Sequence, residues 1–379
     1  MTLAFVAGLT VANNYYNQAL LVNIAHTFGA RESSAGYLSV LTQLGYAAGL
    51  CFLSPLGDRM DRKKLLMGTA GCAGLTMLAL AAAPNLPFIL AAGFLGGFAC
   101  VTPSLSVAHA ASLVPHERRG RAVGAVMSGL LTGILLARAF AGVIGARYGW
   151  RVAFAGGSGL SALAVLALAT LPSSPAPHLK HAYGELLKSL PRIFAREPAL
   201  RRHAALGGLA FCGFGAFWTT LGFRLASLPA KYDGRMVGIF GVVAAAGVLA
   251  AGFAGRLTDV YGSRRVSMAA LAVCVGSFAL LGLSGDNMIL LGIGVFLMDA
   301  GVQATHVTNY SRALSLSDHE RGRFNSIYMV TYFLSAAAGS AIGNLAWQHA
   351  GWAGVCGFSG AMALIGLWLA RMKLPANPA

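Results

Sequence analysis

Charged residues are scarce in this chain, and acidic residues are the scarcest of them. Only 11% of the 379 residues are charged, with 12 Asp and Glu against 28 Lys and Arg. A soluble globular domain has roughly a quarter of its residues charged. The low charge, together with 56% hydrophobic residues, therefore excludes a soluble globular protein and indicates a membrane protein.

Patterns typical of catalytic and metal-binding sites are also absent from the sequence. The six Cys stand singly, mostly in apolar stretches, which fits neither a disulfide framework nor a metal site. No Gly-x4-Gly-Lys-Ser/Thr motif occurs, so an ATP-driven pump is excluded. The first apolar run lacks a basic leader and is too long for a cleavable signal peptide. We expect a protein that is not an enzyme and that needs no cofactor or metal.

Long apolar runs fill nearly the whole sequence instead. About 20 apolar residues suffice for a helix to cross a bilayer, and twelve such runs are found, six in each half. The sequence therefore predicts an all-α membrane protein of twelve transmembrane helices. The predicted spans are residues 2–25, 35–55, 65–84, 87–113, 121–145, 150–171, 203–227, 235–256, 265–284, 287–312, 322–346 and 351–371.

The basic residues are distributed unevenly between the two sides of these spans. The segments after the even-numbered spans, with the span ends beside them and the C-terminal tail, hold 21 of the 28 Lys and Arg. Because cytoplasmic loops carry an excess of Lys and Arg, these segments are expected to face the cytoplasm. We therefore expect a multi-pass protein of the cell inner membrane with both termini in the cytoplasm, and no nucleic-acid partner.

Short patterns recur in the same order about two hundred residues apart. Asp58 and Asp259 each follow an apolar run in similar loop sequences. Arg-Gly-Arg at 119–121 recurs at 321–323, and Gly-Trp at 149–150 recurs at 351–352. Because the patterns recur in the same order and at nearly the same spacing, they predict that one half of the chain is a duplicate of the other. Many secondary transporters use duplicated halves to build a site that opens to either side of the membrane.

The duplication divides the chain into two predicted bundles joined by one polar linker. We expect an N-terminal six-helix bundle at 1–171, a cytoplasmic linker at 172–202 and a C-terminal six-helix bundle at 203–379. The linker starts in a Pro-rich stretch, and its second part has one apolar helical face that could lie along the membrane surface. That face consists of Leu186, Leu190, Ile193 and Phe194.

The loop motif and the repeat resemble those of the major facilitator superfamily of transporters. In the second copy of the motif the matching residues are Gly255, Leu257, Asp259, Gly262 and Arg264. The first copy keeps Leu56, Asp58, Arg59, Arg62 and Lys63 but has Ser54 and Asp61 at the glycine positions. The resemblance covers the whole chain and implies the major facilitator fold, with two pseudo-symmetric six-helix bundles.

A narrower resemblance is to bacterial efflux-type permeases of the arabinose- or purine-efflux-like kind, related to drug:proton antiporters. It rests on residues 14–18, 41–46, 127–138 and 301–303 with His306. The span at 121–145 contains no Pro, so it departs from the Gly-Pro pair of drug antiporters. The resemblance says little about the identity of the solute, and we expect a small organic molecule and protons as the partners of the chain.

The acidic residue of each loop motif lies beside basic residues at the ends of neighbouring spans. A carboxylate there can pair with Arg or cap a helix N-terminus in one conformation only, and so act as a cytoplasmic gate. The alternative is that these charges only anchor helix ends and fix orientation. The candidate gate residues are Asp58, Arg59, Arg62, Arg119, Arg121, Asp259, Arg264, Arg321 and Arg323.

Asp299 is the only acidic residue that falls well within a predicted span. Gln303, His306 and Tyr310 follow it on the same helical face. Because ionisable residues inside a membrane are costly, we expect a role for Asp299 in proton or substrate binding, with His306 able to pass protons. The alternative is a structural Asp paired with a fixed cation.

Arg138 lies near the middle of the span at 121–145 and is the candidate counter-charge. It could bind an anionic solute or pair with Asp299; the alternative is that it reaches to the membrane surface. At an offset of 202, Asp299 aligns with Gly97 and Arg138 with Ser340, so each half has one buried charge that the other lacks.

Amide and aromatic side chains within other spans are candidates to line the substrate cavity, since such groups suit a hydroxylated or aromatic solute. Hydrogen bonding between helices is the alternative role for them. The candidates are Asn14, Tyr15, Asn17, Gln18, Gln43, Tyr46, Trp218, Asn309, Tyr328 and Tyr332.

These features predict a monomeric secondary active transporter that exports a small organic molecule in exchange for protons. Uptake or facilitated diffusion on the same fold is one alternative. A transporter-like sensor that binds a ligand without moving it is another, although the linker at 172–202 is short for a signalling domain.

Overall fold

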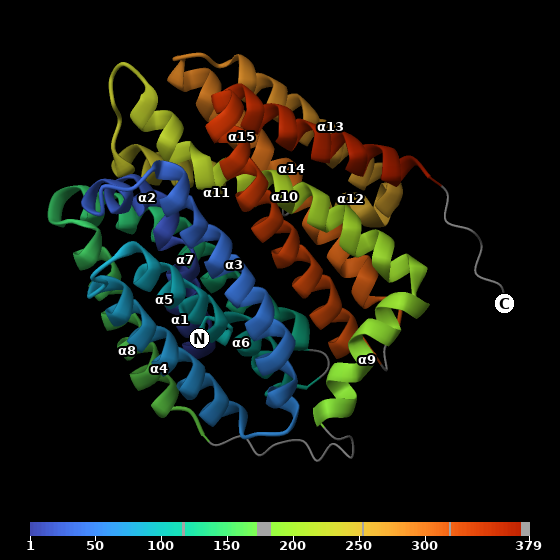
Figure 1. Cartoon of the computed structure of the whole chain (residues 1–379). Helices are drawn as coiled ribbons and strands as arrows, with labels where there is room; N and C mark the ends of the chain where they lie inside the picture. Colours follow the sequence, from blue (N-terminus) through green and yellow to red (C-terminus); the bar gives the residue numbers. More distant parts are fainter. Residues whose placement is uncertain (116–117, 173–182, 252–253, 318–319, 373–379) are drawn as a thin grey trace. The chain divides into compact units, whose positions relative to one another are not determined.

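The computed structural model of the chain describes residues 1–115, 118–172, 183–251, 254–317 and 320–372 (Figure 1). All regular secondary structure in this part of the chain is helical. The chain forms two compact units. Unit 1 comprises Met1–Leu187 and Leu221–Val242, and unit 2 comprises Lys188–Thr220 and Val243–Ala379.

Unit 1 is built mainly from the N-terminal helices. Within it, α3 packs along α5, α4 along α8, and α1 along α7. Its complete helices are α1 (Thr2–Val11), η1 (Ala12–Asn14), α2 (Tyr16–Thr27), α3 (Glu32–Leu53), η2 (Ser54–Asp58), α4 (Arg62–Ala81), α5 (Leu86–Ala99), α6 (Thr102–Ser112), α7 (Arg119–Tyr148) and α8 (Trp150–Ala169).

Unit 2 holds the C-terminal helices, in which α13 packs along both α14 and α15 (Figure 1). Its complete helices are α12 (Ala254–Tyr261), α13 (Ser263–Leu283), α14 (Met288–Leu314) and α15 (Arg321–Arg371). Three further helices continue from one unit into the other, namely α9 (Tyr183–Arg196), α10 (Pro198–Ser227) and α11 (Gly234–Ala251).

Helices long and apolar enough to cross a membrane make up most of the described chain, and nine meet both criteria. The longest of them, α15, is interrupted at Gly351, whose φ of 55° and ψ of −148° are not helical. It therefore contains the two predicted spans at 322–346 and 351–371. The chain is a multi-pass membrane protein.

Two predicted spans are broken rather than continuous. The span at 2–25 is divided by η1, where Asn13 is buried and donates from Nδ2 to Ser161 Oγ at 2.8 Å. The span at 87–113 is divided between Ala99 and Thr102. Pro103, near the start of α6, has no N–H to continue the hydrogen bonding of α5. The span at 235–256 corresponds to α11 and the start of α12, with residues 252–253 outside the described part.

Small residues allow the long helix α7 to approach its neighbours closely. A Cβ at Gly129 would collide with the carbonyl oxygen of Ala4, and one at Gly133 with that of Gly8. Contacts of this kind drive helix association in lipid, where the hydrophobic effect adds little between helices. The glycine-rich sequence of this span therefore packs against α1.

The duplication seen in the sequence recurs in the local structure of the two units. In unit 1, Lys63 Nζ donates to the carbonyl of Ala169 at 2.8 Å and to that of Leu171, near the C-terminus of α8. In unit 2, Arg264 Nε donates to the carbonyl of Ala370 at 3.2 Å, near the C-terminus of α15. Both basic residues are the second residue of their helix, α4 or α13, and bind the last helix of their half.

The Gly-Trp pairs also have matching structures. Gly149 has a φ of 90° and Gly351 a φ of 55°, a region that favours glycine. The following Trp150 and Trp352 are both buried, and each donates from Nε1 to a neighbouring helix of its own unit. The pairs therefore mark equivalent turns between the last two helices of each half.

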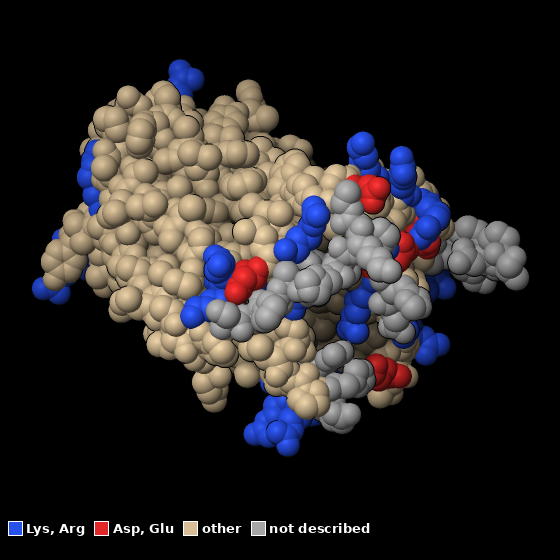
Figure 2. All heavy atoms as spheres, turned by 90° about the horizontal axis from the view of Figure 1, so that it is seen from below, with Lys and Arg blue, Asp and Glu red and all other residues tan. Residues whose placement is uncertain are grey.

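Charged side chains occupy only part of the face seen in Figure 2. Figure 2 shows Lys and Arg in blue at the edges of one face and beside the red Asp and Glu, while broad tan areas carry no charge. Large apolar side chains are fully accessible outside the core, among them Leu283 and Ile289, which are 82% and 75% exposed. Such surfaces suit contact with lipid.

Candidate transport site

Arg138 is a buried cation of α7 in unit 1. Its side chain is 2% exposed, and its Nε donates to Gln18 Oε1 of α2 at 2.9 Å. The guanidinium also lies 5.0 Å from the centre of the Tyr15 ring, a distance typical of a cation–π interaction. Arg138, Gln18 and Tyr15 thus form one polar group from three predicted site residues.

Small residues of α11 pack directly against this group. A Cβ at Gly241 would lie 3.0 Å from Arg138 Cβ, and one at Gly238 would lie 3.0 Å from Ala139 Cα. Because larger side chains would not fit there, α11 holds the backbone of α7 and the stem of Arg138 in place. Reaching to the membrane surface is excluded for Arg138 by this burial and by its bond to Gln18.

The other candidates of unit 1 are buried and partly hydrogen-bonded between helices. Asn17 Nδ2 donates to Thr42 Oγ1 at 3.1 Å, and Tyr46 Oη lies 3.0 Å from Ser104 Oγ. Asn14 and Gln43 are 2% and 3% exposed. The interhelical bonding expected as an alternative role is therefore found for Asn17 and Tyr46.

Asp299 is a buried acid of α14 in unit 2. Its side chain is 2% exposed and lies close to α11, since a Cβ at Gly247 would come 3.3 Å from Asp299 Cβ. Asp299 lies eleven positions after Met288, the first residue of α14, which is about 16 Å along a helix of 27 residues. Asp299 belongs to unit 2 and Arg138 to unit 1, so their pairing stays a prediction.

Two turns beyond Asp299, His306 stands in a group of aromatic rings. Its ring centre is 5.4 Å from that of Tyr310, as their spacing on one face predicts, and 4.4 Å from that of Tyr332. Tyr328 Oη lies 3.3 Å from His306 Nδ1. Tyr332 in turn stacks on Phe211 of α10 at 3.8 Å. We call these five residues the His306 group.

The remaining candidates of unit 2 differ in their surroundings. Asn309 is fully buried, with Oδ1 2.9 Å from His203 Nδ1 and Nδ2 donating to Ser267 Oγ at 3.0 Å. Trp218 is fully buried and contacts Phe217 edge to face at 5.4 Å. Gln303 is half-buried, one turn from Asp299. Asn309 and Trp218 therefore lie in packed surroundings rather than within the His306 group.

The candidate gate residues are only partly brought together. The side chains of Asp58 and Arg119 lie outside the described part of the structure. Arg59, Arg121 and Arg321 are exposed, and Arg62 Nε donates to the carbonyl of Gly57 at 3.0 Å. Within the described residues, Asp259 forms no ion pair with Arg321 or Arg323. The gate therefore stays a prediction.

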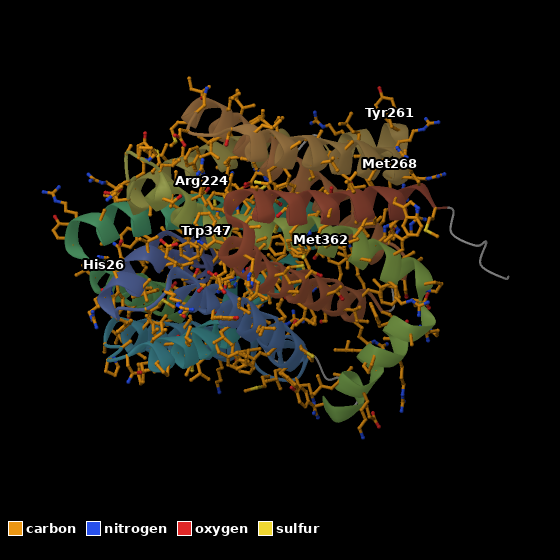
Figure 3. The ribbon with its side chains drawn as sticks, turned by 45° about the horizontal axis from the view of Figure 1, so that its top comes forward. His26, Arg224, Tyr261, Met268, Trp347 and Met362 are labelled. Atoms are coloured by element: carbon orange, nitrogen blue, oxygen red, sulfur yellow. The ribbon has the colours of Figure 1, made fainter. Side chains whose placement is uncertain are left out.

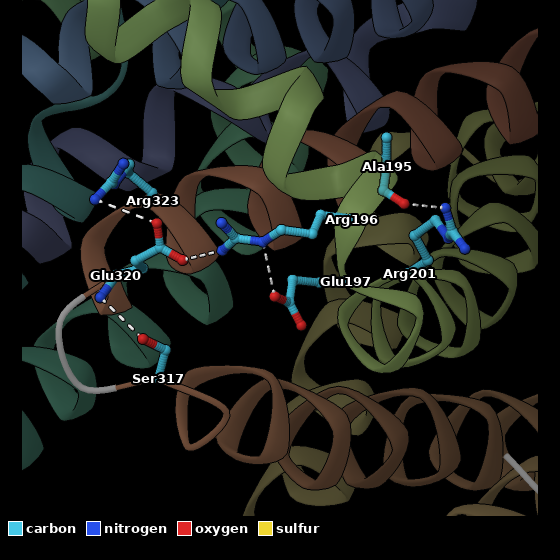
Figure 4. A network of polar contacts seen from close by, with 7 residues as sticks. All are labelled: Ala195, Arg196, Glu197, Arg201, Ser317, Glu320 and Arg323. Carbon is cyan, nitrogen blue, oxygen red and sulfur yellow. Dashed lines mark hydrogen bonds and ion pairs between the residues drawn. The ribbon is translucent and has the colours of Figure 1, made fainter. Parts of the chain in front are cut away.

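Glu320 instead organises the start of α15 (Figure 4). It accepts from Arg196 Nη2 of α9 at 2.6 Å and pairs with Arg323 at 3.3 Å. Arg196 Nε also donates to Glu197 at 3.0 Å, and these bonds raise the pKa of the Arg196 guanidinium. No sequence pattern marks Glu320, because its partner Arg196 is 124 residues away.

Other contacts could not be read from sequence spacing either. Phe211 and His203 lie in α10 and contact predicted site residues of other helices. No periodic pattern in the sequence marks Phe211 or His203. By contrast, Gln18 and Arg138 were both candidates, although their contact was not expected. Gln18 and Arg138 were identified because they are polar residues inside apolar spans. The same criterion could have identified His203.

Three comparisons place this geometry among known proteins. A sequence model of the family described as the Major Facilitator Superfamily matches residues 3–312 and 232–379. The chain is 39% identical over 367 residues to "Uncharacterized transporter YgaY" of Escherichia coli O157:H7, covering 96% of this chain and 93% of that protein.

It is also 34% identical over 379 residues to "Probable transporter SCO4007" of Streptomyces coelicolor, covering 99% of this chain and 87% of that protein. Among solved structures, a D-xylose-proton symporter superposes with a TM-score of 0.79 at 16% identity. That match covers 98% of this chain and 97% of the symporter, and at this identity it shows similarity of the fold alone.

Proposed function

Because the chain belongs to the major facilitator superfamily, whose members are secondary transporters, we propose that it exports a small organic solute in exchange for protons. The bundles at 1–171 and 203–379, joined by the linker at 172–202, would rock to open the site to either side of the membrane. The chain would act as a monomer in the cell inner membrane with both termini in the cytoplasm.

The burial of Asp299 is the observation that supports the proposal of proton coupling. A carboxylate that is 2% exposed and lies well inside a transmembrane helix is costly to ionise. Protonation removes that cost, so the state of Asp299 and the packing around it are linked. Exposure of α14 to one side and then the other would let Asp299 take up and release a proton.

Arg138 supports a second part of the proposal, the recognition of the solute. A guanidinium held by Gln18 and Tyr15 is a fixed, permanent cation in a buried setting. It would bind an anionic group of the solute, or hold Asp299 ionised until the solute or a proton competes for the pair. The His306 group, in which the three tyrosine rings lie 4.4–5.6 Å from the His306 ring, would contact an aromatic or hydroxylated part of the solute.

Efflux is placed before uptake because of the resemblance to efflux-type permeases in residues 14–18, 41–46, 127–138 and 301–303. The basic loops would serve orientation rather than binding of nucleic acid. Asp259 and its neighbours would act as the cytoplasmic gate.

The experiment has two steps. First, purified protein is screened by thermal shift against sugars, nucleosides, organic acids and antibiotics to find a solute. Flux of that solute into or out of proteoliposomes is then measured with and without a pH gradient. We expect a pH gradient to drive flux in the native chain, and Asp299→Asn to lose at least tenfold of the driven flux.

Asp286→Asn removes the same charge from an exposed loop and should leave the flux unchanged. Full coupling in Asp299→Asn would overturn the assignment of Asp299. Flux that ignores the pH gradient would favour facilitated diffusion, and binding without flux would favour a sensor.

A further inference from the structure

A polar cavity of about 120 Å³ lies in unit 2, away from Asp299. Helices α10, α13, α14 and α15 all contribute to its lining. One water molecule occupies about 30 Å³ in the liquid, so the cavity has room for a group of several heavy atoms. The polar residues that line it are Arg202, His203, Ser263, Arg264, Ser267 and Asn309.

Two arginines give this cavity a positive charge. Within the described residues, neither Arg202 nor Arg264 forms an ion pair with a carboxylate. Both donate instead to backbone carbonyls at the end of α15. Arg202 Nη2 binds the carbonyls of Ala370 and Met372 at 2.9 and 2.6 Å, and Arg264 binds those of Ala370 and Arg371.

These carbonyls hold the arginines in place without neutralising them. The C-terminus of a helix corresponds to about half a negative charge, against two full positive charges here. Arg202 Nε is also buried without a hydrogen-bond partner among the described residues. The cavity thus has an excess of positive charge and one donor still to satisfy.

The N-terminus of α13 adds backbone donors to the same place. Ser263, which lines the cavity, is the first residue of this 21-residue helix. The first N–H groups of a helix have no partner within it and favour an anion. No side chain caps α13, because the preceding residue is Gly262. In Figure 3, Tyr261 points outward at the end of α12 and is 56% exposed, so it does not cover this end.

The equivalent position in unit 1 already holds an anion. Asp61, 201 residues before Gly262, accepts from the backbone N–H of Lys63 at 2.8 Å and of Lys64 at 3.2 Å through Oδ1. A carboxylate of the chain itself therefore occupies the start of α4. At the start of α13 the corresponding carboxylate is missing, while the basic residue that matches Lys63, namely Arg264, is retained.

The buried polar side chains complete the set of donors. Asn309 donates from Nδ2 to Ser267 Oγ, so the hydroxyl of Ser267 still has its own hydrogen to donate. Asn309 Oδ1 faces His203 Nδ1 at 2.9 Å, which places a hydrogen on that nitrogen and fixes the ring. These residues come from three helices and are positioned before any ligand binds.

We propose that this cavity binds a phosphate group, either of an anionic phospholipid headgroup or of free phosphate. Two guanidinium groups and an uncapped helix N-terminus are the donors that recognise phosphate. A lipid source agrees with the expected position of this end of unit 2 at the cytoplasmic leaflet, where anionic lipids gather. The proposal is independent of which solute is transported.

The test uses the full chain purified in a neutral, phosphate-free detergent. Its apparent melting temperature is measured against increasing inorganic phosphate at constant ionic strength, and separately against phosphatidylglycerol, with phosphatidylcholine as the neutral lipid. We expect a saturable rise of several degrees. A rise with phosphatidylglycerol alone assigns the site to a lipid, and a rise with both assigns it to the phosphate group itself.

Three variants decide whether the rise comes from this cavity. Ser263→Asp places a carboxylate at the helix N-terminus, which favours the helix, so the variant should melt no lower than the native chain but lose the rise. Arg264→Gln should need at least tenfold more ligand. Arg265→Gln removes the same charge from a neighbour that does not line the cavity and should behave as the native chain. No rise in the native chain, or an equal rise in Ser263→Asp, would overturn the proposal.

Discussion

The start of α4 in unit 1 and the start of α13 in unit 2 occupy the same place in the repeat but are built differently. Asp61 caps α4 with two hydrogen bonds to backbone N–H groups, whereas Gly262 leaves α13 without a side-chain cap. Both helices nevertheless hold the last helix of their half, through Lys63 and Arg264. The repeat thus preserves the framework contact while the charge beside it differs.

The same difference appears at the two buried charges. Ser340, which aligns with Arg138, is a packing residue that accepts from Thr219 Oγ1 at 3.0 Å and donates to the carbonyl of Gly215. Gly97, which aligns with Asp299, lies so close to α3 that a Cβ would collide with the carbonyl oxygen of Thr42. The aligned positions serve packing, so each half has a packing residue where the other half has a buried charge.

The largest effect is expected from adding one methyl group at the glycine that aligns with Asp299. In Gly97→Ala the new Cβ meets backbone of α3, which cannot move as a flexible side chain would. Overpacking of this kind costs about 1–3 kcal/mol. We therefore expect a clearly lower apparent melting temperature in detergent.

The matched control is Gly71→Ala in α4, where a Cβ would meet nothing within 4 Å. Alanine is favoured over glycine in a helix interior by about 0.5–1 kcal/mol, so this variant should melt at the native temperature or above it. Equal melting of the two variants would show that position 97 is not a packing position.

Much of the framework could be predicted from the sequence because it depends on local features. Apolar length predicts the membrane helices. The turns at Gly149 and Gly351 follow from the repeat. The break in the span at 2–25 could not be predicted, because it depends on contacts such as the one between Asn13 and Ser161, 148 residues apart.

The candidate site was predictable to a smaller extent. Polar residues within apolar spans singled out Arg138, Asp299 and His306, all of which the structure places in buried or half-buried positions. The partners of these residues come from distant helices, as for Arg138 and Gln18, which are 120 residues apart. Spacing along one helix does not indicate which face of another helix it meets.

A smaller effect is expected from removing the cap that only unit 1 has. Asp61→Ala leaves the N–H groups of Lys63 and Lys64 without their acceptor at the start of α4. Loss of an N-cap typically costs about 1 kcal/mol. The apparent melting temperature should fall by a few degrees, and less than in Gly97→Ala.

Asp61→Ser keeps an oxygen acceptor that suits an N-cap and should restore most of the loss. If Asp61→Ser melts as low as Asp61→Ala, the carboxylate matters for its charge rather than for the cap. The contrast with Gly262 would then concern electrostatics alone.

The smallest effect is expected at the contact that both units share. Lys63→Gln removes the charge that Lys63 places at the C-terminal end of α8, where it donates to the carbonyls of Ala169 and Leu171. A cation at a helix C-terminus contributes about 0.3–1 kcal/mol at low ionic strength, and salt screens the contribution. The variant should therefore melt slightly below the native chain in low salt and close to it in high salt.

Lys64→Gln removes the same charge from the exposed neighbour and should show neither change. If the melting temperature of Lys63→Gln stays below that of the native chain in high salt, hydrogen bonding rather than charge holds the last helix of the N-terminal half. Arg264 in unit 2 would then be expected to act in the same way.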